Sequence, residues 1–132
     1  MSRSAAVQCE LTYAEIVEAI EDAFGKGTIG LAGCALGRVT ETARSTFVGV
    51  SLRLVVRHRL ETLCDPGEDA RVVSFKMNRQ VREELADLLG VDENEVFRLH
   101  HHAAGLRVKS IAYRDIVRGI ERELAKAHSL GA

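Results

Sequence analysis

Proline, tryptophan and cysteine are scarce in this chain of 132 residues, and each scarcity limits the fold. There is one proline and no tryptophan, and the other aromatic side chains are four Phe and two Tyr. The interior must therefore consist mainly of Leu, Val, Ile and Ala. The three cysteines, Cys9, Cys34 and Cys64, form no C-x-x-C pair, which excludes a disulfide framework. An odd number of widely spaced thiols fits a reducing compartment, so we expect a cytoplasmic protein.

Charge of one sign is also lacking. The formal net charge is −1 at pH 7, and the composition alone gives no argument for a nucleic-acid partner. The two halves differ slightly, because residues 1–70 carry a net charge of −3 and residues 71–132 a net charge of +2. This asymmetry has the direction expected if the second half contacts DNA.

No hydrophobic run is long enough to cross a membrane. The longest extends from Phe47 to Val56 and is interrupted by Arg53, whereas a spanning helix needs about 20 apolar residues. The N-terminal residues also lack the apolar segment of a signal peptide. We expect no membrane partner, and the chain length predicts a single domain over residues 1–132.

Local patterns predict an α+β fold. Thr12 and Glu15 form a capping box at the start of a helix that Gly25 ends. Apolar and polar residues alternate in 46–60 and in 70–77, and with a glycine-dotted segment in 25–39 these ranges predict a three-stranded antiparallel sheet. The C-terminal half is expected to be helical, with Asn78 capping a helix over 79–89 and a last helix from Tyr113 to His128.

Residues 82–108 carry the most informative pattern. Leu85, Ala86 and Leu89 fall on one helical face, Gly90 breaks the helix, and Val96 and Leu99 mark the apolar side of a second helix. Asp92 and Glu95 have the spacing of a capping box at its start. At the level of this motif the segment resembles helix-turn-helix DNA-binding domains, which implies that the second helix enters the major groove.

A helix over residues 92–102 predicts a DNA-contacting face. Asn94, Arg98 and His101 would lie on its outer side, where Asn suits adenine and Arg suits guanine. Phosphates would be met by Arg79, Arg107 and Lys109. Three acids in the first turn, Asp92, Glu93 and Glu95, argue against a close approach to phosphates.

Four basic residues on the last predicted helix recur every fourth position. This ridge either follows a phosphate backbone or is an ordinary solvated face, and the second interpretation is preferred. Its members are Arg114, Arg118, Arg122 and Lys126.

The structural alternative is a β-hairpin between residues 95 and 110, giving an α-β-β-β-α-β-β-α sandwich. In a strand, His100 and His102 would project to one side and could share a metal such as zinc, whereas in a helix they diverge. That alternative implies a compact oligomeric enzyme or ligand-binding protein with a histidine-lined pocket. No motif identifies a catalytic residue or a cofactor.

We favour the regulator hypothesis, namely a small DNA-binding transcriptional regulator. Residues 1–70 would form its dimerisation or effector half, and residues 71–132 its helix-turn-helix half. Because DNA half-sites repeat with the helical turn, a homodimer or higher homo-oligomer is expected.

Overall fold

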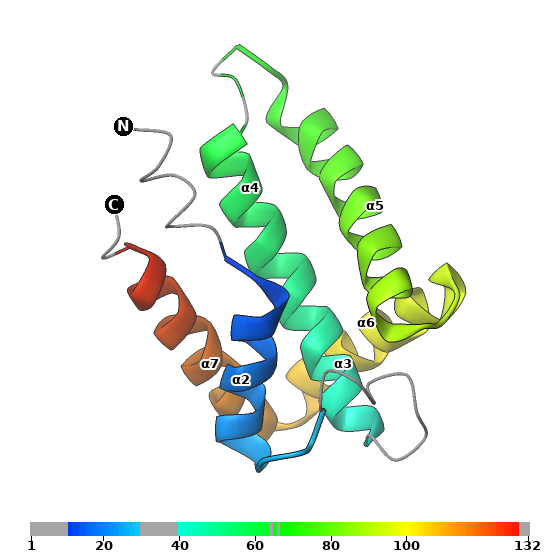
Figure 1. The fold of residues 1–132 in the computed structure, drawn as a ribbon, viewed down its shortest axis with the longest axis vertical. Coiled ribbons are helices and arrows are strands. Elements are labelled where there is room, and N and C mark those ends of the chain that lie inside the picture. The colour runs from blue at the N-terminus through cyan, green and yellow to red at the C-terminus, as the bar shows by residue number, and fades with distance from the viewer. Residues whose placement is uncertain (1–10, 30–39, 64, 66, 130–132) are drawn as a thin grey trace.

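A computed structural model describes residues 11–29, 40–63, 65 and 67–129. With the labels of Figure 1, its helices are α2 (Tyr13–Phe24), α3 (Glu41–Val50), the π-helix η2 (Ser51–Val55), α4 (Val56–Leu63), α5 (Ala70–Leu89), α6 (Glu93–Lys109) and α7 (Ile111–Ser129). These described segments contain no β-strand. The predicted α+β class is therefore wrong.

The central element is one continuous rod formed by α3, η2 and α4. In Figure 1, α2 and α7 lie on one side of this rod and α5 lies on the other. The most extensive contact between separate helices is that of α3 with α6. Side chains on every face of the rod between residues 45 and 56 are buried, which is the pattern of a helix surrounded by protein.

The predicted strand over 46–60 is wrong for this reason. Its β-branched residues, among them Val48, Val50 and Val55, are buried against different neighbours around a helix. The strand over 70–77 is wrong as well, since Asp69 caps a helix that starts at Ala70, well before Asn78. Most of the third predicted strand, residues 30–39, lies outside the described residues.

Two local predictions are confirmed. The Thr12 hydroxyl accepts from the Glu15 backbone N–H at 3.3 Å, and the Glu15 carboxylate accepts from the Thr12 N–H at 3.1 Å. This capping box opens α2, which ends at Gly25. The last predicted helix, Tyr113 to His128, lies within α7, although Ile116 of its expected buried stripe is exposed.

Candidate nucleic-acid interface

Residues 93–109 form a helix, so the hairpin alternative and its sandwich are wrong. Helix α5 ends at Gly90, which has a left-handed backbone (φ 67°) that favours glycine. The next N–H, that of Val91, donates to the Ala86 carbonyl at 3.0 Å and closes the helix end. Asp92 then caps α6 by accepting from the Glu95 N–H at 2.9 Å. The left-handed Gly90 and the capping Asp92 therefore determine where the turn lies.

The inner side of α6 packs against the rest of the bundle. Val96, Leu99 and Ala103 are buried there. At the crossing with α3, a Cβ added to Gly49 would lie 3.2 Å from the Ala103 Cβ, so the two helices approach closely because residue 49 has no side chain. This packing fixes the outward direction of α6.

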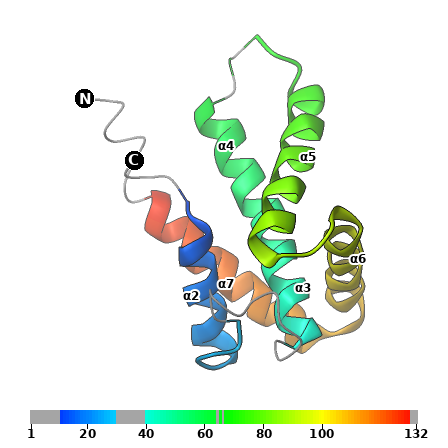
Figure 2. The same cartoon turned by 45° about the vertical axis from the view of Figure 1, so that its right-hand side comes forward.

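Two of the predicted base-contacting residues lie on the outer side of α6. Asn94 and His101 are exposed, and Figure 2 shows α6 at the edge of the molecule. The exposed Phe97 shares this side, where its ring lies 4.7 Å from that of His101 and 5.5 Å from the Arg82 guanidinium.

The third predicted residue, Arg98, is exposed but already paired. Its Nε and Nη2 atoms donate to the Glu95 carboxylate at 2.7 and 2.8 Å, and its Nη1 atom donates to Glu41 at 2.5 Å. These hydrogen bonds hold the pKa of the Glu95 carboxyl below its usual value. Arg98 therefore ties the first turn of α6 to the start of α3.

The predicted phosphate contacts are dispersed. Arg79 lies on α5 and pairs with Glu83 at 3.5 Å. Arg107 is partly buried and pairs with Glu121 of α7 at 3.5 Å, on the inner side of α6. Lys109 is exposed at the C-terminal end of α6. Of these three, only Lys109 is exposed on α6 itself.

The helical backbone separates His100 from His102. The His102 Nδ1 atom lies 2.7 Å from the Ser45 hydroxyl, and its Nε2 atom lies 3.7 Å from Glu41. His100 instead lines two cavities with Arg53. Within the described ranges no three His, Cys, Asp or Glu side chains gather as a metal site. The predicted metal pair required an extended backbone, and that condition is not met.

Two features of the candidate site have no signal in the sequence pattern. One is the bridge between Arg98 and Glu41, whose positions are 57 residues apart. The other is the π-helix η2, which brings Arg53 to the cavities beside His100. A periodicity analysis that assumes regular helices or strands cannot find either.

Among the helices of the described segments, none is both long and apolar enough to span a bilayer. Comparisons with protein-family models, with curated proteins and with solved structures find no match to this chain. Its function therefore has to be argued from its own geometry.

Proposed function

We propose that this protein is a small DNA-binding regulator in which α6 is the recognition helix. The single observation that carries the proposal is the exposed side of α6, where Asn94 and His101 stand outward from a helix fixed by α5, the Gly90 turn and α3. A helix of this length fits the major groove, and Asn and His side chains offer hydrogen bonds to base edges.

Internal ion pairs reduce the objection from the acidic first turn. Glu95 is paired with Arg98 and lies 3.6 Å from the Arg44 guanidinium. Glu93 lies 3.7 Å from the Arg82 guanidinium. With these partners present, the first turn of α6 repels phosphates less than its composition suggests.

DNA binding is tested by selection from a random-sequence duplex pool, followed by fluorescence anisotropy at several salt concentrations. Asn94→Ala and His101→Ala should each weaken binding to the selected duplex by about 1–3 kcal/mol, the worth of a specific base contact. Thr62→Ala, at an exposed polar position on α4, is the matched control and should bind normally.

A second pair of variants separates base contacts from the basic ridge of α7. Arg118→Gln and Arg122→Gln change exposed cations on α7 and should lower the salt dependence only if that ridge follows the phosphates. The proposal fails if no duplex is enriched, or if the α6 variants bind the selected duplex as tightly as the unaltered chain.

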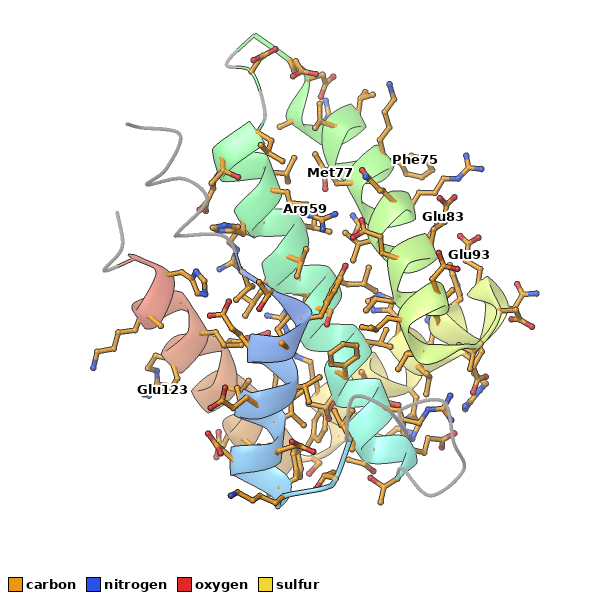
Figure 3. The ribbon with its side chains drawn as sticks, in the orientation of Figure 1. Arg59, Phe75, Met77, Glu83, Glu93 and Glu123 are labelled. Atoms are coloured by element: carbon orange, nitrogen blue, oxygen red, sulfur yellow. The ribbon has the colours of Figure 1, made fainter. Side chains whose placement is uncertain are left out.

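The same proposal includes a homodimer, because two recognition helices are needed for repeated half-sites. The exposed side of the first half of α5 offers the surface. Val72 is 50% exposed and Phe75 72% exposed, and Figure 3 shows Phe75 pointing away from α4 while Met77 points toward it. A groove of about 340 Å³ runs along the same helix beside Val72 and Lys76.

Charges around these side chains favour a second copy of the chain in antiparallel orientation. If Val72 of one copy faces Phe75 of the other, the antiparallel arrangement brings Glu68, which directly precedes the N-cap Asp69 of α5, toward Arg79. All four residues are exposed. The pairing is self-complementary, as a two-fold interface requires. In this arrangement Arg79 pairs with Glu68 of the second copy and does not contact DNA phosphates.

Sedimentation equilibrium tests the dimer. Phe75→Ser should raise the dissociation constant, whereas Ile111→Ser, at a position 69% exposed on α7, should not. Glu68→Arg and Arg79→Glu should each weaken association, and the double variant should restore it. A monomer at all concentrations, or no response to Phe75→Ser, would refute this interface.

A further inference from the structure

Two adjoining cavities form a groove beside the central rod. One, of about 370 Å³, lies against η2 and α4 and is also lined by Ser74 and Asn78 of α5. The other, of about 280 Å³, lies between Gly49 of α3 and the second half of α6. Arg53 and His100 line both cavities. The groove therefore gathers residues from five consecutive helical elements, α3 to α6 with η2 among them.

The side chains that line this groove are partly apolar and partly positively charged. Leu52, Val56 and Leu60 supply apolar surface in the larger cavity, and Arg53 and Arg57 supply positive charge. Among the residues that the structure describes, no Asp or Glu side chain lines either cavity. Such a surface attracts an anion that also has an apolar part.

Arg53 is held in place from outside the groove. Its guanidinium donates to the Glu121 carboxylate at 3.3 Å, with a second approach of 3.1 Å. Burial raises the pKa of Glu121, opposed by the nearby Arg107. Arg57 is exposed at the rim, where its charge also acts on Glu121, but among the described residues no ion pair joins it to a carboxylate. One cation is thus anchored, and the other remains able to close over a ligand.

His100 supplies the observation that points to a ligand. Its Nδ1 atom is buried and has no hydrogen-bond partner in the described part of the chain. An unpaired buried polar atom is unfavourable, so a bound group that pairs with it would recover the lost hydrogen-bond energy. Burial, with His101 and Arg82 nearby, also lowers the pKa of His100. The ring is therefore neutral at pH 7 and offers one N–H to an acceptor.

We propose that this groove binds a small amphipathic carboxylate. Its carboxylate would lie between Arg53, Arg57 and His100, and its aryl or alkyl part would lie along Leu52 and Val56. The volume suits a molecule of about ten to fifteen heavy atoms, at the lower end of ordinary ligand sites. The proposal stands independently of DNA binding, because neither Asn94 nor His101 lines the groove.

Isothermal titration calorimetry with phenylbutyrate and with octanoate tests the proposal, and their primary amides serve as uncharged controls. The carboxylates should bind and the amides should bind at least about tenfold more weakly, since a lost charged hydrogen bond is worth about that factor. Phenylphosphonate tests whether the groove selects carboxylates or accepts any apolar anion; equal or tighter binding of the phosphonate would overturn the carboxylate assignment.

Variants locate the site. Arg57→Gln should weaken carboxylate binding about tenfold, whereas Arg71→Gln, at an exposed position near the start of α5, should leave it unchanged. Backbone amide NMR shifts on ligand addition should centre on residues 49–60, 74–78 and 100–108. Absence of binding, equal binding of the amides, shifts centred elsewhere, or an unaltered Arg57→Gln affinity would each overturn the proposal.

Discussion

Arg59 joins three helices through a single carboxylate. Its Nη1 and Nη2 atoms donate to Glu84 of α5 at 2.6 and 2.9 Å, and the Tyr13 hydroxyl of α2 donates to the same carboxylate at 3.3 Å. The Arg59 hydrogen bonds lower the pKa of Glu84 from 4.5, its value in an unfolded chain. The folded protein therefore binds this proton less tightly than the unfolded chain.

The Arg59 bridge predicts a pH-dependent loss of stability. Arg59→Met should lower the free energy of unfolding at pH 7 by about 1–3 kcal/mol, because a bidentate charged hydrogen bond is removed. The stabilisation is complete above pH 4.5 and is lost as the pH falls through the folded pKa of Glu84. Urea unfolding at pH 7 and pH 3 measures the difference, which should be smaller at pH 3.

Both tyrosines should resist ionisation in the folded protein. Burial, followed by the charge of Glu84, raises the pKa of Tyr13 from 10.0 to about 12. Burial also raises the pKa of Tyr113, whose hydroxyl lies 2.9 Å from the Thr46 hydroxyl. These are the two tyrosines of the chain, and tryptophan is absent, so tyrosinate absorbance reports on them without interference.

A spectrophotometric titration checks this expectation. At pH 10 the protein in guanidinium chloride should show half of its tyrosinate absorbance, and the folded protein should show much less. Because both groups hold their protons more tightly when folded, stability should fall as the pH rises from 10 through the folded pKa values. Identical titration curves with and without denaturant would contradict the buried positions of both hydroxyls.

Residue-scale contacts were predictable from sequence only where they are local. The Thr12–Glu15 box and the Asp92 cap join positions three apart, and their spacing alone indicated them. Arg98 was expected to face solvent, which is correct, but its pairing with Glu41 depends on how α3 and α6 cross. Nothing near Arg98 in the sequence specifies that crossing.

Two helical glycines, Gly49 and Gly119, differ in how closely other side chains approach them, and substitutions at them test the packing of the helices. Gly49 faces Ala103 across the closest approach of α3 and α6, whereas a Cβ at Gly119 of α7 would meet no atom within 4 Å. Gly119→Ala should stabilise the protein by about 0.5–1 kcal/mol, since alanine restricts the unfolded chain and favours helix.

Gly49→Leu should instead destabilise the protein by about 1–3 kcal/mol, because the added side chain overpacks the crossing. Thermal unfolding followed by circular dichroism gives both values. If Gly49→Leu raises the midpoint, as Gly119→Ala is expected to, the close packing of α3 on α6 is wrong.

The error in the predicted elements also has a physical cause. A strand with one buried face and a helix buried on all sides can both have sequences dominated by valine and leucine. Residues 48–56 are such a sequence, and the structure shows that they form a buried helix. Length and flanking residues did not separate the two, because η2 interrupts the regular helical period in the middle of the rod. In α5, exposed Val72 and Phe75 made the pattern resemble a half-buried strand.

At the scale of the whole molecule, several helices could be predicted from the sequence, but how they pack against one another could not. The helical period identified α2, most of α7 and the turn at Gly90, whereas the three-stranded sheet that was to separate an N-terminal half from a C-terminal half is absent from the described segments. Instead, the rod lies within residues 1–70, and α5, α6 and α7 of the second half all contact it.

The π-helix makes one position in this rod dispensable. A π turn holds one residue more than an α turn needs, so deleting Arg53 would let the rod close its hydrogen bonds in the regular α pattern. The faces before and after the deletion would keep their directions, and we expect a cooperative thermal transition. Deleting Arg79 from the regular α5 should cost far more, because it rotates half of that helix by about 100°.

The five-residue π-helix η2 thus contains one residue more than a regular α-helix would need to span the same distance. We expect a chain without Arg53 to keep its interior and to lose the guanidinium that lines the groove and pairs with Glu121. If the groove binds a carboxylate as proposed, deletion of this one residue would remove a ligand-binding cation while the helices around it keep their packing.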